Sequence, residues 1–400
     1  MNIAIIGGGA SGLMAGGFLT EKGHSVTIFD VNDKCGKKIY ITGKGRCNVT
    51  NDCSIETYLS NVVNGEKFMF SSIRGFNCQD TIMFFEGKGV PLKKERGNRV
   101  FPKSDKASDI TKALLKHCKD CKINLNEKVV LVEKKNEDFI VTSNQKQYVF
   151  DKVIISTGGK SYSATGSKGD GYIFAQKLGH NIIKPRPALV PIKIKDDFCS
   201  SLEGVSLKNV TLNANIDGKE ISNFGEMLFT FDAISGPIAL SMSSYIGKCQ
   251  KVTLSIDFKP ALNEQQLEER IMRDFSSNLN KNLTYIIKGL LPNRMVDVFL
   301  TKAGIDGQIK VNSVTAVQRK QIVKTLKIFP VEFERLYDIE AGIVTAGGVN
   351  LKEVNPKTME SKICEGLFFI GEVLDIDCLT GGFNLQTAFS TAVACAKHLD

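Results

Sequence analysis

The sequence predicts an α/β protein built on a Rossmann-like, three-layer domain of the two-dinucleotide-binding type, with an inserted β-rich domain that carries a helical subdomain. Three apolar segments, near the N-terminus, around residue 154 and near the C-terminus, predict this fold. Ile3–Ile6 precedes a glycine turn and a helical pattern. Val153–Ser156 ends in Thr157-Gly158, and Leu367–Ile370 ends in Gly371-Glu372. Short apolar runs of this kind are typical of strands buried on both faces, so we expect both chain ends in one sheet.

The dinucleotide-binding domain is expected to comprise residues 1–188 and 342–400. Pro185, Pro187 and Pro191 lie close together and indicate where the chain crosses into the insertion. The β-rich inserted domain is expected at 189–260 and 329–341. Apolar residues at 3.6-residue spacing predict the helical subdomain at 261–328.

The glycine turn has the pattern Gly7-x-Gly9-x-x-Gly12, with Ala10 and Ser11 inside it. Gly7 permits the tight turn, Gly9 leaves room for a pyrophosphate against the backbone, and Gly12 permits close packing of helix on strand. The helix N-terminus offers N–H donors and a positive dipole end to phosphates. Asp30 ends the next strand, where an acid accepts hydrogen bonds from a ribose hydroxyl. This unit predicts a dinucleotide, either FAD or NAD.

Later elements favour FAD over NAD. Segments 128–133, 139–143 and 147–150 read as a three-stranded antiparallel meander, which includes Val129 and replaces a plain helical crossover. Such a meander, a strand ending in Thr157-Gly158 and a late strand ending in Gly371-Glu372 are devices of FAD domains. In such domains the late carboxylate binds the ribityl hydroxyls of the flavin. We therefore expect FAD as the resident cofactor.

Three segments of the sequence are distinctive: Gly36–Asn51, Ser156–Gly171 and Thr345–Gln386. They contain Gly45-Arg46-Cys47-Asn48 and Gly381-Gly382-Phe383-Asn384-Leu385-Gln386. In these segments the chain resembles the bacterial family of NAD(P)/FAD-dependent oxidoreductases that includes aminoacetone oxidase and the bile-acid-inducible N-type (3-dehydro-bile acid delta-4,6-reductase) flavoproteins. The resemblance extends over nearly the whole chain.

The cofactor-binding residues that we expect come from the glycine motif, the meander and the segments that carry the resemblance. The resemblance implies that Gly45 to Asn48 pack near the flavin and that the C-terminal group contacts it. The full set is Gly7, Gly9, Ala10, Ser11, Gly12, Asp30, Lys37, Lys38, Gly45, Arg46, Cys47, Asn48, Val129, Thr157, Gly158, Gly371, Glu372, Asp375, Gly382, Phe383, Asn384, Leu385 and Gln386.

The formal charge is +9, from 52 Lys and Arg against 43 Asp and Glu. Two basic stretches are dense, at 34–46 and at 93–103. The first contains Lys37 and Lys38 and is expected to face the cofactor phosphates, with a surface cation as the alternative for Arg46. The second is a solvated loop or a contact for an anionic substrate. The basic residues lack interleaved aromatic residues and no RNA-binding motif is recognisable, so the sequence predicts a small-molecule substrate and no nucleic-acid partner.

FAD is expected to transfer hydride through its N5 atom, and the sequence has no second strand–glycine motif–helix unit for NAD. NADH or NADPH is therefore expected to bind transiently as electron donor. The first expectation is NAD(P)H-dependent reduction of an enone or related C=C bond in a small or hydrophobic substrate. An oxygen-using oxidase of an amine-type substrate, an RNA-binding or RNA-modifying flavoprotein, and a flavin-bearing sensor without turnover are the alternatives.

No catalytic acid or base stands out, and no metal site is expected, because Cys118-x-x-Cys121 lacks a second Cys or His pair. The segment Leu228–Pro237 departs from the family pattern, since Phe231 replaces a polar His or Asp and Ala233 replaces Gly. It is either an altered active-site segment or a structural turn. No basic leader and no membrane-length apolar run occur, so we expect a cytoplasmic protein. The sequence leaves the oligomeric state and the choice between NADH and NADPH open.

Overall fold

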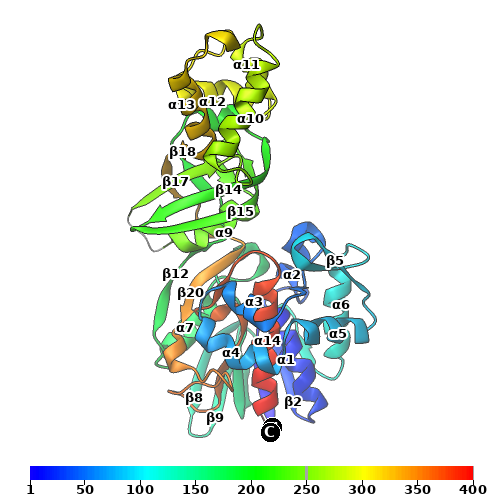
Figure 1. The fold of residues 1–400 in the computed structure, drawn as a ribbon. Helices are drawn as coiled ribbons and strands as arrows, with labels where there is room; N and C mark the ends of the chain where they lie inside the picture. Colours follow the sequence, from blue (N-terminus) through cyan, green and yellow to red (C-terminus); the bar gives the residue numbers. More distant parts are fainter. Residues whose placement is uncertain (248–250, 400) are drawn as a thin grey trace. The chain divides into compact units, whose positions relative to one another are not determined.

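The structure, a computed structural model, describes residues 1–247 and 251–399. The chain divides into two compact units (Figure 1). The first unit consists of Met1–Ala188 with Ile339–Asp400, and the second of Leu189–Asp338. Each has its own apolar core. The predicted candidate site lies in the first unit.

The centre of the first unit is a five-stranded parallel sheet in the order β21-β11-β1-β2-β7. Ile5 of β1 lies opposite Ile154 of β11 on one side and Ile28 of β2 on the other. All three side chains are fully buried, as expected of a parallel sheet covered on both faces. Both chain ends therefore share one sheet, which confirms the prediction. The strands are β1 (Asn2–Ile6), β2 (Ser25–Phe29), β7 (Lys122–Asn124), β11 (Lys152–Ile155) and β21 (Leu367–Phe369).

Two helices from opposite ends of the chain, α1 (Ala10–Glu21) and α14 (Phe383–His398), pack against each other (Figure 1). Small buried residues such as Ala15 of α1 and Ala392 of α14 permit close packing of helices. The sequence predicts the last helix over 388–398, but it begins at Phe383. It starts there because Gly382, at φ 100°, ends the preceding loop in the left-handed region that glycine adopts without strain.

The meander predicted before β11 is confirmed as a three-stranded antiparallel sheet in the order β10-β9-β8. Its strands are β8 (Val129–Lys135), β9 (Asp138–Ser143) and β10 (Gln147–Phe150). The other elements of the first unit before the insertion are α2 (Lys37–Ile41), β3 (Thr50–Asn51), α3 (Ile55–Ser60), β4 (Val62–Asn64), α4 (Glu66–Gly75), α5 (Cys78–Gly87), β5 (Leu92–Glu95), β6 (Arg99–Pro102), α6 (Ala107–His117) and α7 (Asp170–Lys177).

The proline-rich segment that the sequence assigns to a crossing is itself a strand, β12 (Ile182–Ala188). It pairs antiparallel with β20 (Val344–Val349), with a register irregularity between Ile183 and Arg186. Prolines lack the N–H that a ladder needs, so they are tolerated in a short two-stranded sheet with a broken register. The sequence predicts strand character at 341–345, whereas β20 starts later because a 3₁₀ turn occupies Ile339–Ala341. A short bridge strand, β22 (Asp377–Cys378), pairs with β4.

The second unit contains a seven-stranded sheet in the order β18-β17-β14-β15-β16-β13-β19. Its strands are β13 (Ile192–Ile194), β14 (Ser206–Ile216), β15 (Lys219–Phe229), β16 (Ala233–Ser235), β17 (Val252–Asp257), β18 (Phe329–Val331) and β19 (Phe333–Leu336). Asn263 and Thr315 begin helices with capping boxes, each completed by a glutamine three residues later. The helices are α8 (Phe198–Ser201), α9 (Pro237–Ile246), α10 (Glu264–Ser276), α11 (Leu283–Lys288), α12 (Met295–Ala303) and α13 (Ala316–Lys327). None of the described helices of the chain is long and apolar enough to span a bilayer.

Candidate flavin site

The glycine turn after β1 shows the packing that its sequence predicts. A Cβ on Gly12 would lie 2.0 Å from the carbonyl oxygen of Gly7, so the helix can approach the turn only without a side chain there. A Cβ on Gly9 would meet no atom within 4 Å. Gly9 is therefore not required by the protein's own packing, and the space beside it is open for a ligand. Ala10 and Ser11 form the first turn of α1, which has no capping side chain and no acidic residue.

The late glycine loop lies directly against this turn. A Cβ on Gly371, whose φ is 73°, would lie 2.6 Å from the Oγ of Ser11. The Gly371 N–H donates to the Oγ of Thr391 in α14 at 3.0 Å. The structure therefore brings together the two glycine loops that the sequence predicts at one site.

Asp30 is buried, and protein groups already use both of its carboxylate oxygens. Oδ2 accepts from the N–H of Gly8 at 2.9 Å, and Oδ1 accepts from the backbone and side-chain nitrogens of Asn32 at 2.8 and 2.9 Å. Burial raises the pKa of Asp30, and these hydrogen bonds oppose that rise. A carboxylate has about four lone-pair sites, so capacity for a ribose hydroxyl is left.

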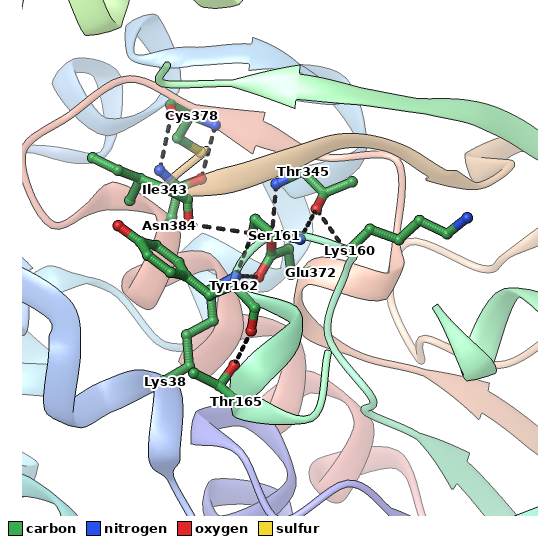
Figure 2. Close-up of polar contacts among 10 residues, drawn as sticks. All are labelled: Lys38, Lys160, Ser161, Tyr162, Thr165, Ile343, Thr345, Glu372, Cys378 and Asn384. Atoms are coloured by element: carbon green, nitrogen blue, oxygen red, sulfur yellow. Dashed lines mark hydrogen bonds and ion pairs between the residues drawn. The ribbon is translucent and has the colours of Figure 1, made fainter. Parts of the chain in front are cut away.

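Figure 2 shows a polar network that joins three of the predicted segments. The Nζ of Lys38 lies 2.7 Å from Oε2 of Glu372 and 2.7 Å from the Oγ of Ser161. Oε1 of Glu372 accepts from the N–H of Thr345 at 2.8 Å and from Ser161 Oγ at 3.2 Å. The Oγ1 of Thr345 accepts from the backbone N–H of Lys160 at 2.7 Å. Glu372 is therefore held in a fixed position by protein donors, and its contact with ribityl hydroxyls stays a prediction.

Three basic residues of the first dense stretch are paired with carboxylates. Lys37 forms an ion pair with Asp33 at 2.8 Å, and Lys38 pairs with Glu372. Arg46 forms ion pairs with Glu95 at 2.8 Å and with Asp105 at 3.3 Å. Its guanidinium also stacks over the ring of Phe101 at 4.2 Å. In this structure these cations are neutralised by the protein, so their expected contact with cofactor phosphates is untested.

The Gly45–Asn48 turn has an unusual backbone and one buried polar atom that stands out. Gly45 and Cys47 have φ of 85° and 62°. Cys47 is fully buried, and burial raises the pKa of its thiol to about 12. It is thus a neutral packed thiol in the structure. The Oδ1 of Asn48 is buried without a hydrogen-bond partner among the described residues.

The predicted contacts near the C-terminus lie in two different environments: some belong to the loop at the start of α14, and Gln386 lies in its buried part. A Cβ on Gly382 would lie 2.4 Å from the carbonyl of Thr50, and Asn384 caps the loop by hydrogen bonds to the N–H and carbonyl of Cys378 at 3.0 and 2.9 Å. Gln386 is fully buried. Its oxygen accepts from two threonine hydroxyls and its nitrogen donates to Phe76 O and Ser390 Oγ. The Gln386 amide is saturated by protein partners and therefore anchors α14 internally.

The remaining predicted residues take ordinary positions around this site. Val129 is buried at the start of β8, Phe383 is buried against Tyr58 with ring centroids 6.2 Å apart, and Leu385 is partly buried. Gly158 has a φ of 73°, and the Oγ1 of Thr157 is buried without a partner among the described residues. Asp375 is buried, and its N–H donates to Val349 O at 3.2 Å.

A charged pair of the first unit that the sequence did not predict joins Arg186 and Asp377. Nη2 of Arg186 lies 3.8 Å from Oδ1 of Asp377, and the two side chains are 14% and 0% exposed. Nε and Nη1 of Arg186 have no hydrogen-bond partner among the described residues. Asp377 lies in the sequence between the predicted contacts Glu372 and Gly382. Arg186 lies opposite Ala346 of β20, next to Thr345 of the polar network. The available signal was an arginine between two prolines, Pro185 and Pro187, next to an apolar run.

The residues present fit FAD. Two of the predicted contacts, Asn48 and Thr157, hold buried polar atoms without partners among the described residues, as a bound polar ligand requires. The open space at Gly9 admits a pyrophosphate, and α1 and α14 both begin without a capping side chain or an acidic residue in the first turn. When bound, FAD supplies hydride chemistry that no side chain can provide.

Comparison with known proteins shows the family to which the chain belongs. The family model described as "HI0933-like protein Rossmann domain" matches residues 1–398. The chain belongs to the HI0933-like family. It is 33% identical to the ribosomal RNA dihydrouridine synthase of Haemophilus influenzae over 99% of this chain and 97% of that protein. It is 29% identical to the 3-dehydro-bile acid delta(4,6)-reductase of Clostridium scindens over 99% and 98%. This member of the family is an FAD-dependent oxidoreductase, as the sequence predicts.

A solved structure of the same fold is the 3-ketosteroid-delta4-(5alpha)-dehydrogenase from Rhodococcus jostii, at a TM-score of 0.50. The alignment covers 99% of this chain and 96% of that chain, at 14% sequence identity. At this identity the likeness concerns the fold alone. It agrees with the α/β flavoprotein fold predicted from the sequence.

Two further segments of this family member have structural roles. Cys118 is buried and its thiol donates to the carbonyl of Leu13 at 2.8 Å. Phe231 is exposed in the tight turn between β15 and β16, where Thr230 N–H donates to Ala233 O at 2.8 Å. Asp232 in this turn accepts from the hydroxyl of Tyr337, which raises the pKa of that tyrosine to about 12. These contacts favour the structural turn over an altered active-site segment for 228–237.

Proposed function

We propose that this protein is an RNA-modifying flavin reductase that saturates the C5–C6 double bond of a uracil in ribosomal RNA. The observation that carries the proposal is the 33% identity, over almost the full length of both chains, to a ribosomal RNA dihydrouridine synthase. This favours the RNA-modifying alternative over the small-molecule substrate that the sequence predicts first. Reduction of a hydrophobic dienone is the second candidate, because a bile-acid reductase is 29% identical over a similar length.

The two candidate reactions share one chemistry. In uracil the C5–C6 double bond is conjugated with the C4 carbonyl, and in a 3-oxo steroid the 4,6-double bonds are conjugated with the ketone. Saturation adds a hydride to the carbon remote from the carbonyl and a proton to the adjacent carbon. Bound FAD would supply that hydride, and we propose NADH or NADPH as the reductant of the flavin. The proposed reaction is therefore still the reduction of a C=C bond conjugated with a carbonyl group, but the substrate differs from the one that the sequence predicts first.

The chain's own residues suit the carbonyl end of such a substrate. The Arg186 guanidinium offers two N–H-bearing nitrogens without partners among the described residues, in a nearly buried position. A donor of this kind stabilises negative charge that develops on a carbonyl oxygen as hydride arrives at the conjugated carbon. The fully buried Asp377 beside it keeps the guanidinium in place. We propose that Arg186 binds the substrate carbonyl, and that the Lys38–Glu372 pair holds the cofactor side of the site in shape.

The test is product analysis under anaerobic conditions. The purified yellow protein is incubated with unmodified rRNA transcribed in vitro and with NADH or NADPH, and the digested RNA is examined for dihydrouridine by mass spectrometry. A 3-oxo-4,6-diene steroid and oxygen uptake with amine substrates serve as parallel arms. Formation of dihydrouridine that requires both the protein and NADH or NADPH supports the proposal. Steroid reduction without dihydrouridine would replace it by the second candidate, and oxygen uptake with an amine alone would refute both.

A further inference from the structure

We infer that one face of helix α11 is an RNA-docking surface, an inference that rests on the proposed function. We define the α11 face by Lys281, Tyr285, Lys288 and Lys310. It belongs entirely to the second unit, and Figure 1 shows α11 at the end of that unit opposite the strands. The ligand that fits this face is a single-stranded segment of RNA, because the face combines an exposed aromatic ring with cations that form no ion pair among the described residues.

The net positive charge of the chain is concentrated in this part of the sequence. Residues 279–327 contain nine Lys and Arg but only two Asp, a net charge of +7 out of the +9 of the whole chain. In sequence these residues are scattered and give no recognisable motif. The fold places them on a compact set of helices. A local excess of this size attracts polyanions.

Several of the nine basic residues have protein partners. Lys302 pairs with Asp196 at 2.6 Å, Arg319 with Glu268 at 3.0 Å and Lys327 with Asp257 at 2.6 Å, while Arg294 donates to two backbone carbonyls. The others form no ion pair with a carboxylate among the described residues: Lys281, Lys288, Lys310, Lys320 and Lys324. In the first unit, by contrast, part of each dense basic stretch is paired with carboxylates, as in the pairs of Lys93 with Asp105 and of Lys94 with Asp52.

The α11 face contains three of these lysines, and one of them contacts an aromatic ring. The Nζ of Lys281 lies 5.5 Å from the centroid of Tyr285, and Lys288 follows Tyr285 by three residues, on the same side of the helix. Lys310 forms an antiparallel bridge with Asn282, next to Lys281. Tyr285 is 55% exposed.

The ring of Tyr285 is not needed for the core of the second unit. Leu283, Ile286 and Ile287 occupy the opposite side of the helix and are 0–4% exposed. The Tyr285 ring is exposed beside cations, and an aromatic ring between cations is a common stacking platform for single-stranded nucleic acid. The ammonium groups then meet phosphates while the ring meets a base. Tyr285 lies between Lys281 and Lys288 in the sequence, so the expectation that the basic residues lack interleaved aromatic residues is wrong for this segment.

The experiment measures the affinity of the FAD-loaded protein for a labelled 20-nucleotide single-stranded RNA of mixed sequence as a function of salt. The triple variant K281Q/K288Q/K310Q is expected to weaken binding at least tenfold near 0.1 M salt. It should also lower the slope of log Kd against log salt by about 2, since each phosphate contact with a single strand contributes about 0.7. Tyr285→Ala is expected to weaken binding about tenfold with the salt slope unchanged, and Tyr285→Phe to restore it, because stacking requires a ring and not a hydroxyl.

The matched control is K208Q/K219Q/K251Q, which removes the same charge from exposed lysines elsewhere in the second unit. This control should keep the salt slope within about 0.7 of wild type. Equal losses in the two triple variants would overturn the local assignment, as would a Tyr285→Ala variant that binds like wild type. If K281Q/K288Q/K310Q and Tyr285→Ala form dihydrouridine with the KM of the wild-type protein, the docking face is refuted but the proposed function is not. A wild-type protein that neither binds RNA nor forms dihydrouridine would refute the proposed function with it.

Discussion

Replacing Gly9 by alanine tests whether the cofactor contacts the backbone at this position, because the added methyl group does not disturb the packing of the protein itself. A Cβ there would meet no protein atom within 4 Å, and Gly9 has a φ of −83°, which alanine adopts without strain. The free energy of unfolding of the apoprotein should therefore change by less than about 1 kcal/mol. If the pyrophosphate approaches the Gly9 backbone, the added methyl group overpacks that contact at a cost of about 1–3 kcal/mol. The Kd for FAD should then rise about 5- to 150-fold.

The assay is a fluorescence titration of apoprotein with FAD, run beside thermal denaturation without cofactor. Gly87→Ala is the matched control, because its Cβ also meets nothing within 4 Å and it ends α5 away from the predicted contacts. Gly12→Ala is the opposite case, since a Cβ 2.0 Å from the Gly7 carbonyl must displace the helix and should prevent stable folding. A Gly9→Ala protein that binds FAD as tightly as wild type would refute the assignment of the glycine turn to the cofactor phosphates.

Other perturbations test the remaining parts of the first unit. Burial between Phe18 and Phe84 lowers the pKa of His117 to about 4, against an ordinary value of 6.5. The folded state then binds fewer protons than the unfolded state, so stability is complete above pH 6.5 and falls as the pH drops toward 4, by on the order of 2–3 kcal/mol. Urea denaturation of His117→Phe should lack most of this acid-side loss, and an unchanged pH profile would exclude the histidine as its source. Arg186→Met leaves the buried carboxylate of Asp377 without its cation and should lower the free energy of unfolding by about 3–5 kcal/mol. The double variant Arg186→Met/Asp377→Asn should recover part of this loss. Equal stability of the single and the double variant in urea would refute the pairing. Arg186→Lys, which keeps the charge but not the fork, should retain flavin and lower kcat at least tenfold, whereas a wild-type kcat would exclude the proposed carbonyl contact.

Some properties of this protein follow from local sequence alone. The order strand, Gly7-x-Gly9-x-x-Gly12, helix, Asp30 predicts a dinucleotide-binding turn, because Gly7 and Gly12 meet steric requirements of the turn itself and Gly9 leaves room for a ligand. The apolar run Leu367–Phe369 identifies a buried strand for the same reason, as its side chains require cover on both faces. The family was also readable from short segments such as Gly381–Gln386.

Tertiary structure decided which side chains stay available to a ligand. Gln386 and Lys38 belong to predicted motifs, but the fold surrounds the first with protein partners and pairs the second with Glu372. Arg186 lies outside every motif and beside Asp377, and its Nε and Nη1 donate no hydrogen bond to any described residue. Lys281 and Lys288 flank Tyr285 in the sequence, whereas Lys310 reaches this segment only through the fold, by its bridge with Asn282. Hydrogen bonds and ion pairs join residues hundreds of positions apart, so sequence alone determines the turn chemistry and the buried strands, while only the assembled fold determines which polar groups are already satisfied.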